Sequence, residues 1–131
     1  MLRLLLVDDS RTMRNIQKNV LKILGEQQIV EASDGYEALT AVASNHEGFT
    51  LILVDWNMPN MDGLSFVKQF REKDKTTPVI MVTTEAEKSR ILDAIRAGVN
   101  NYVIKPFTPD SLLGRVQQTL EKCKAVAAAA A

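Results

Sequence analysis

The sequence predicts an α/β protein of the (βα)5 class, whose doubly wound parallel sheet has the strand order 2-1-3-4-5. Two observations carry this prediction. Five short apolar runs alternate with segments of helical spacing, and strands that alternate with helices pair in parallel, with helices on both faces. The chain has 131 residues, which matches the size of one domain.

The predicted strands are short runs, most of them rich in Val, Ile or Leu. They cover residues 4–7, 28–32, 51–54, 79–82 and 102–104. The first, third and fourth runs are continuously apolar, so we expect them in the centre of the sheet. The second run carries Gln28 and Glu31, and the fifth is short, so these two are expected at the edges. This pattern gives the order 2-1-3-4-5.

Capping residues mark the ends of the predicted helices. Asp34, with an acid three residues later, resembles a capping box, and Asp62 precedes another helical segment. Thr108 precedes a proline that suits the first helical position. Gly25 and Gly98 fall where helices should end. The first helix is expected to bury one face, made of Met13, Ile16, Val20, Ile23 and Leu24.

The composition argues against several classes of function. Lys and Arg total 16, as do Asp and Glu, so the net charge is zero; a basic excess that would bind nucleic acid or an acidic membrane is missing. One cysteine and one histidine are too few for a disulfide framework or for a Cys- or His-cluster zinc site. No apolar run approaches the ~20 residues that cross a bilayer. We therefore expect a cytoplasmic, soluble, single-domain protein. We also expect it to be a monomer.

The chain divides into one expected domain and a short tail. Residues 1–124 carry all the predicted strands and helices. Residues 125–131 are almost entirely alanine, and they are either an extension of the last helix or an artefact. We assign no function to this tail.

Charged and hydroxyl side chains follow the predicted strands. Asp8 and Asp9 follow the first strand, Asp55 the third, Thr83 the fourth and Lys105 the fifth. In open α/β sheets, ligands bind beyond the carboxyl ends of the strands, where the strand order reverses. The first and third strands flank that point, so three carboxylates should converge there.

The negative charges of such a group repel one another, and this repulsion is relieved either by raised pKa values or by a bound cation. Mg²⁺ prefers oxygen ligands and commonly binds one or two carboxylates together with a phosphate oxygen. With Lys105 as a fixed positive charge and Thr83 as a donor, the pocket suits a phosphoryl group, and Asp55 is the best candidate nucleophile. Taken singly, Asp8 and Asp9 could cap a helix, and Asp55 could be an ordinary loop acid.

Four motifs then carry a resemblance to a known family. They are Leu-Leu-Val-Asp-Asp-Ser at 5–10, Val-Asp-Trp-Asn-Met-Pro at 54–59 with Met-Asp-Gly at 61–63, Val-Thr-Thr-Glu at 82–85, and Tyr-Val-Ile-Lys-Pro-Phe at 102–107. From about residue 2 to 124, the chain resembles the receiver domain of two-component response regulators, which has a flavodoxin-like fold. The second and fourth motifs look closest to CheY-like single-domain chemotaxis regulators.

The resemblance implies a role for each acidic residue. Asp55 would accept a phosphoryl group from the phosphohistidine of a histidine kinase. Asp9 and Asp55 would contact Mg²⁺ together with the backbone carbonyl of Asn57, and Asp8 would hold a metal-bound water. No other cofactor is implied.

The resemblance also implies a switch. Thr83 would move to bond the phosphoryl oxygen, Lys105 would pair with it, and Tyr102 would turn inward to fill the space that Thr83 leaves. Asn57 and Glu85 match positions that influence dephosphorylation. The Lys105–Pro106 peptide is expected to be cis, and Trp56 is expected to be a partly exposed aromatic beside the site.

The implied partners are a histidine kinase, a flagellar motor switch protein or a phosphotransfer protein, and a phosphatase. Thr84 departs from the small residue usual in the family, and its β-branched side chain is expected to slow the access of phosphodonors or phosphatases. A phosphate sink or phosphorelay intermediate is an alternative on the same fold.

An alternative of another class is a Mg²⁺-dependent phosphohydrolase, although the second acid of its Asp-x-Asp motif is missing at Ser10. A flavin carrier would need a phosphate loop that residues 11–14 do not resemble.

Overall fold

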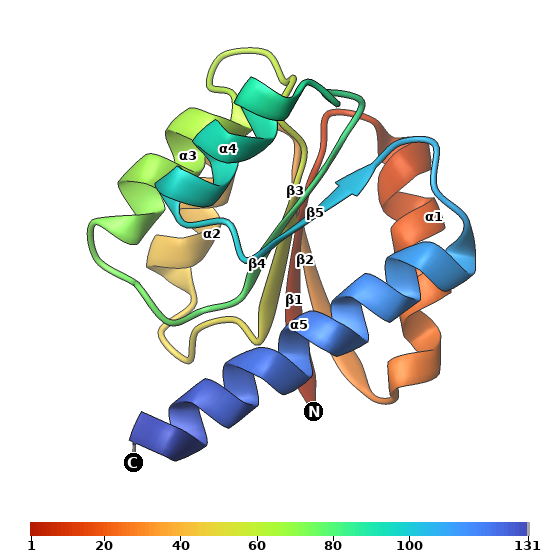
Figure 1. Ribbon diagram of the computed structural model, residues 1–131, viewed down its shortest axis with the longest axis vertical. Helices are drawn as coiled ribbons and strands as arrows, with labels where there is room; N and C mark the ends of the chain where they lie inside the picture. Colours follow the sequence, from red (N-terminus) through yellow and green to blue (C-terminus); the bar gives the residue numbers. More distant parts are fainter. Residues whose placement is uncertain (131) are drawn as a thin grey trace.

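The structure is a computed structural model that describes residues 1–130, with side chains described for residues 1–124. Its strands form one parallel sheet in the order β2-β1-β3-β4-β5 (Figure 1). The predicted fold class and strand order are therefore confirmed. The strands are β1 (Leu2–Val7), β2 (Gln27–Ala32), β3 (Leu51–Val54), β4 (Val79–Thr83) and β5 (Asn101–Ile104).

The helices cover both faces of the sheet (Figure 1). They are α1 (Arg11–Leu21) followed by the 3-10 turn η1 (Lys22–Leu24), α2 (Gly35–Ser44), α3 (Gly63–Arg71), α4 (Lys88–Ala97) and α5 (Pro109–Ala130). The α5 helix thus includes the alanine-rich residues up to Ala130. None of the described helices is both long enough and apolar enough to span a membrane.

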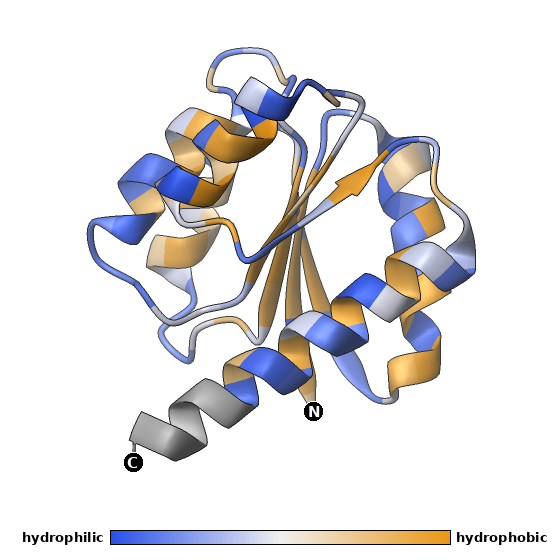
Figure 2. Ribbon diagram, viewed as in Figure 1, coloured by the Kyte–Doolittle hydropathy of each residue, from blue (hydrophilic) through white to orange (hydrophobic). Residues whose placement is uncertain are grey.

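Alternation along β1 divides the core into two layers. Leu5 and Val7 pack with residues of α2, α3 and α4 on one face. Leu4 and Leu6 pack with residues of α1 and α5 on the other face. This division follows from the pleat, because successive side chains of a strand point to opposite faces. The central strands are accordingly apolar apart from Arg3 near the start of β1 and Thr83 at the end of β4 (Figure 2).

The predicted caps hold the helix ends. The Asp34 and Asp62 side chains accept hydrogen bonds from backbone N–H groups in the first turns of α2 and α3. Thr108 accepts one from the Ser111 N–H. Gly98 ends α4 in the left-handed conformation, with φ of 113°, a region that glycine adopts without steric cost.

The predicted apolar face of α1 is partly wrong. Ile16 is 41% exposed and Ile23 is 72% exposed, whereas Gln17 and Leu21 are the buried residues of this helix. Ile23 lies in η1, and a 3-10 turn has three residues per turn, so the α-helical spacing no longer applies there.

Candidate functional site

The carboxyl edge of the sheet gathers the predicted acidic residues. Asp8 and Asp9 follow β1, and Asp55 follows the adjacent strand β3. One carboxylate oxygen from each of the three lies within 4.8 Å of the others. The convergence expected at the point where the strand order reverses is therefore present in the structure.

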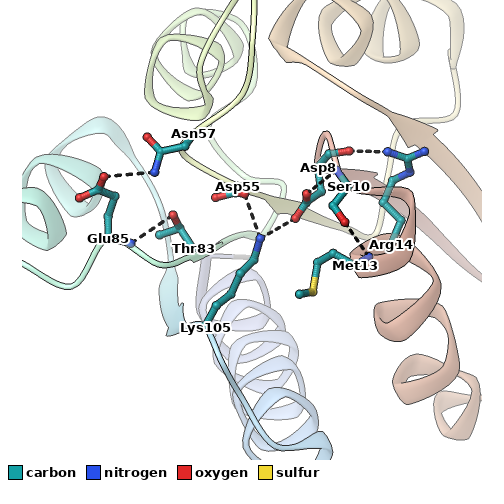
Figure 3. Close-up of polar contacts among 9 residues, drawn as sticks. All are labelled: Asp8, Ser10, Met13, Arg14, Asp55, Asn57, Thr83, Glu85 and Lys105. Carbon is teal, nitrogen blue, oxygen red and sulfur yellow. Dashed lines mark hydrogen bonds and ion pairs between the residues drawn. The ribbon is translucent and has the colours of Figure 1, made fainter.

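Lys105 joins two of these carboxylates. Its Nζ lies 2.8 Å from Oδ2 of Asp8 and 2.9 Å from Oδ2 of Asp55. Figure 3 shows the lysine side chain reaching from the end of β5 to a point between the two acids. Asp8 is 1% exposed and Asp55 is 8% exposed, so the ammonium group partly neutralises two buried negative charges.

Burial shapes the protonation of this cluster. Burial raises the pKa of Asp8 above its ordinary value, and hydrogen bonds from Lys105 and from the Ser10 N–H only partly oppose the shift. Burial alone would lower the pKa of Lys105, but its bonds to Asp8 and Asp55 outweigh burial and raise it. The lysine therefore keeps its charge at neutral pH, while the Asp8 carboxylate is held at an energetic cost.

One oxygen of the cluster has no partner within the described residues. Oδ1 of Asp55 is buried and forms no hydrogen bond. A buried, unpaired carboxylate oxygen is costly unless a ligand completes it. Carboxylate oxygens suit a hard divalent cation such as Mg²⁺. The donors present therefore fit a metal ion or a phosphoryl group.

A close backbone approach holds Asp55 in place. The N–H of Asp55 donates to the carbonyl of Val7, and the N–H of Gly63 donates to the carbonyl of Trp56. A Cβ atom at Gly63 would lie 1.9 Å from the Asp55 carbonyl oxygen, so only glycine fits here. No role for Gly63 was predicted from the sequence, although its place directly after the Asp62 cap is a usable signal.

Three side chains converge on Glu85, in the loop between β4 and α4. The Thr83 hydroxyl accepts a long hydrogen bond of 3.4 Å from the Glu85 N–H. The Tyr102 hydroxyl donates to the Glu85 carbonyl at 2.7 Å, and Nδ2 of Asn57 donates to Oε1 of Glu85 at 3.1 Å. The carboxylates of Asp8, Asp9 and Asp55 have no hydrogen bond to Thr83, Asn57 or Tyr102 within the described part of the chain.

Two neighbours of the site bear on other expectations. Trp56 is 3% exposed, so the expectation of a partly exposed ring is wrong. The Arg90 guanidinium lies over this ring, 5.3 Å from its centroid, and so helps to cover it. The Lys105–Pro106 peptide is cis, as expected, and Thr84 is exposed.

Comparison with known proteins identifies the family. The family model for the response regulator receiver domain matches residues 4–117. The chain belongs to the response-regulator receiver family. Within this receiver domain, the four motifs that carried the resemblance lie on the carboxyl edge of the sheet or in the loops beside it.

The curated relatives of this receiver domain include chemotaxis proteins. A CheY homolog of Campylobacter jejuni is 46% identical over 121 residues, covering 91% of this chain and 92% of the relative. Chemotaxis protein CheY1 of Helicobacter pylori is also 46% identical, covering 91% and 97%. The solved structure of CheY4 of Vibrio cholerae has a TM-score of 0.82 at 35% identity, covering 91% and 98%. The domain is therefore CheY-like.

Proposed function

We propose that this receiver domain is a phosphorylation-activated response regulator in which Asp55 accepts a phosphoryl group. The observation that carries the proposal is the buried Oδ1 of Asp55, unpaired within the described residues and grouped with two further carboxylates. Lys105 already binds the other oxygen of Asp55. One oxygen is therefore oriented by the protein, and the other is left for a ligand.

The proposed reaction is phosphoryl transfer from the phosphohistidine of a histidine kinase. An oxygen of Asp55 forms the new phosphorus–oxygen bond while the phosphorus–nitrogen bond breaks. The imidazole leaves with the electron pair of that bond and takes up a proton from solvent. The product is an acyl phosphate on Asp55.

The chain supplies one fixed positive charge to the proposed site. Lys105, held between Asp8 and Asp55, can turn an N–H toward a phosphoryl oxygen without leaving the site. Asp8, Asp9, Asp55 and the backbone carbonyl of Asn57 are the groups proposed to hold Mg²⁺. When bound, Mg²⁺ supplies positive charge that offsets the carboxylates and the transferred group.

The contacts at Glu85 support the proposed switch. Thr83 and Tyr102 bond the N–H and the carbonyl of Glu85, respectively. If Thr83 turns to bond a phosphoryl oxygen on Asp55, it gives up its long bond to Glu85. The N–H of Glu85 then loses its partner, while Tyr102 still bonds the Glu85 carbonyl. Added charge at Asp55 is thereby coupled to the loop before α4 and to β5.

Asn57 and Glu85 are proposed to influence the lifetime of the phosphorylated state. Their side chains bond one another and so join the loop after β3 to the loop after β4 beside Asp55 (Figure 3). A water molecule, or a side chain of a phosphatase, would pass this pair on its way to the acyl phosphate. Thr84, exposed nearby, would narrow the same approach.

The output proposed for the switch is protein binding in chemotaxis, with the flagellar motor switch as the target. The names of the relatives support this proposal, since those at 46% identity are chemotaxis proteins. A phosphate sink or phosphorelay intermediate would share the same site and is the outcome that the binding experiment below must separate.

The first test is covalent labelling. Wild-type protein is incubated with acetyl phosphate and Mg²⁺, and the intact mass is measured. We expect one phosphoryl group on the wild type and none on Asp55→Asn. Asp93→Asn makes the same chemical change on the exposed surface of α4 and should label like the wild type. Labelling of Asp55→Asn to the wild-type extent would move the acceptor elsewhere.

The second test concerns the partner. Phosphorylated and unphosphorylated protein are compared for binding to a motor-switch peptide and for transfer of the phosphoryl group to a phosphotransfer domain. Phosphorylation-dependent binding to the peptide supports the motor function. Rapid transfer to the phosphotransfer domain without peptide binding supports the phosphate sink.

A further inference from the structure

The orientation of Asp9 depends on its backbone. The Asp9 carboxylate is exposed, and among the described residues no hydrogen bond holds it, whereas Asp8 and Asp55 are both tied to Lys105. A free side chain samples several rotamers. The backbone position from which Asp9 reaches the other two carboxylates is therefore set by the peptide group that joins Asp8 to Asp9.

Arg14 holds that peptide group. In the second turn of α1, its Nη1 donates to the carbonyl oxygen of Asp8, as Figure 3 shows. Its Nε donates to Oε1 of Glu31 on β2 at 2.9 Å. The planar guanidinium group thus spans two elements, and its two bonds fix the position of the Asp8 carbonyl relative to β2.

The two bonds from Arg14 to Asp8 and Glu31 form a clamp, and a second cation shares its glutamate. Lys18, one helical turn after Arg14, binds Oε2 of Glu31 at 2.7 Å. These contacts with Lys18 and Arg14 lower the pKa of Glu31 although burial opposes the shift, so Glu31 remains charged at neutral pH. The Asp8 N–H also donates to the carbonyl of Ala32, the last residue of β2. The turn between β1 and α1 is therefore fixed from both sides of Asp8.

We propose that Arg14 is a positioning residue for the metal and phosphoryl site, acting through the Asp8–Asp9 peptide group to aim the Asp9 carboxylate. This inference rests on the proposed function. Within the described residues, Arg14 bonds none of the carboxylate oxygens of Asp8, Asp9 and Asp55; its effect passes through the backbone carbonyl of Asp8. Outer contacts that orient metal ligands commonly change affinity by about tenfold or more.

Whether substitution of Arg14 weakens or strengthens Mg²⁺ binding separates a positioning role from a purely electrostatic one. A positive charge near a cation site repels the cation, so removal of that charge alone should strengthen Mg²⁺ binding. Loss of positioning should weaken it. Arg14→Met removes both the charge and the clamp, and Arg14→Lys keeps the charge but removes the planar fork. Lys18→Met removes an equal charge and leaves the bond from Arg14 to Asp8 intact.

The experiment measures Mg²⁺ affinity by titration calorimetry, under conditions in which each variant is fully folded by circular dichroism. We expect about tenfold weaker binding in Arg14→Met and a loss of similar direction in Arg14→Lys. Lys18→Met should bind as tightly as the wild type or more tightly. If both Arg14 variants bind Mg²⁺ as tightly as Lys18→Met, the proposal is overturned.

A measurement without metal keeps the two proposals distinct. The carbonyl ¹³C shift of Asp8 reports the hydrogen bond from Arg14 directly. We expect it to change in both Arg14 variants and to stay constant in Lys18→Met; an unchanged shift in the Arg14 variants overturns the inference. Absence of saturable Mg²⁺ binding in the wild type would instead count against the proposed function, while the carbonyl shift would still test the clamp.

Discussion

The two edges of the sheet carry polar clusters of different character. At the amino edge, Arg71 at the end of α3 donates from Nε to the Gly98 carbonyl and from Nη2 to Oδ1 of Asn100, both at 3.0 Å. That Asn100 oxygen also accepts from the N–H of Val79, where β4 begins. At the carboxyl edge, three carboxylates lie together, two of them share Lys105, and Oδ1 of Asp55 has no partner among the described residues.

The contrast separates stability from function. Asp74, in the amino-edge cluster, accepts bonds from the N–H groups of Thr76 and Thr77 and from the Thr77 hydroxyl. Buried side-chain atoms of this cluster are all paired within the described chain, so the cluster joins elements and needs nothing further. In the carboxyl-edge cluster, by contrast, a buried carboxylate oxygen has no partner within the described chain. Such unpaired buried groups are typical of ligand-binding sites.

The largest expected difference between the edges appears when the cation of each cluster is removed. Lys105→Met leaves Asp8 and Asp55 buried without a counter-charge and should cost about 3 kcal/mol of unfolding free energy. Arg71→Met breaks the bonds to Gly98 and Asn100 and should cost about 2 kcal/mol. Urea unfolding at neutral pH measures both losses.

Mg²⁺ should then discriminate between the two variants. At about 100 times its Kd, a ligand that binds only the folded state adds about 2.7 kcal/mol. Removal of the Lys105 charge should tighten Mg²⁺ binding, so at a fixed Mg²⁺ concentration Mg²⁺ should stabilise Lys105→Met more than the wild type and reduce its loss. Arg71→Met keeps the site intact, so Mg²⁺ should stabilise it as much as the wild type and leave its loss unchanged. Equal effects of Mg²⁺ on both variants would remove the distinction between the edges.

The residues of the carboxyl edge can be predicted from the sequence, whereas the contacts of the amino edge cannot. Asp8, Asp55 and Lys105 come directly after apolar runs, and parallel strands bring their carboxyl ends to one edge, so backbone topology alone places these residues together. Their chemical roles stay predictions. The amino-edge contacts of Arg71 depend on side-chain conformations and on the exact ends of α3 and α4, which periodicity does not fix.

The same limit explains the residues near the site that the sequence analysis missed. Arg14 reaches the Asp8 carbonyl from the second turn of α1, and Arg90 covers Trp56 from α4. Both contacts depend on the rotamer of a long, flexible side chain. Burial of Trp56 was missed for this reason, because a residue directly after a strand end gives no sign of what packs over it. Ile23 was misplaced because the change from α to 3-10 geometry has no clear signal in the sequence.

Neutralising one carboxylate should change the free energy of unfolding by a smaller amount, with opposite sign at the two edges. Burial raises the pKa of Asp8, so the protein disfavours its charged form, and Asp8→Asn should raise the unfolding free energy by about 1 kcal/mol. Burial alone would also raise the pKa of Asp74, but hydrogen bonds from Thr77 and Thr76 and the charge of Arg71 hold it below its ordinary value. Asp74→Asn should lower stability by about 1 kcal/mol.

The pH dependence checks the assignment at Asp74. Because its pKa is depressed in the folded state, its carboxylate stabilises the fold above the ordinary value of 3.8, and that contribution is lost as the pH falls further. The difference between the wild type and Asp74→Asn should therefore shrink below that pH. A loss of stability in Asp8→Asn as large as that in Asp74→Asn would show that both acids are structural.

The smallest expected effect concerns Tyr102, which joins the carboxyl edge to the backbone of Glu85. Burial first, and then the negative charges of Glu85 and Asp55, raise the pKa of Tyr102 from 10.0 to about 12, while Arg90 opposes the shift. Tyrosinate absorbance in a Tyr36→Phe background should show one transition near pH 12, and its absence in Tyr102→Phe assigns it. Glu85→Gln should lower the transition, because one of the charges that oppose ionisation is removed. A transition at the ordinary value in the Tyr36→Phe protein would mean that the hydroxyl is solvated rather than bonded to Glu85, and Tyr102 would then have no link to the loop that Thr83 holds.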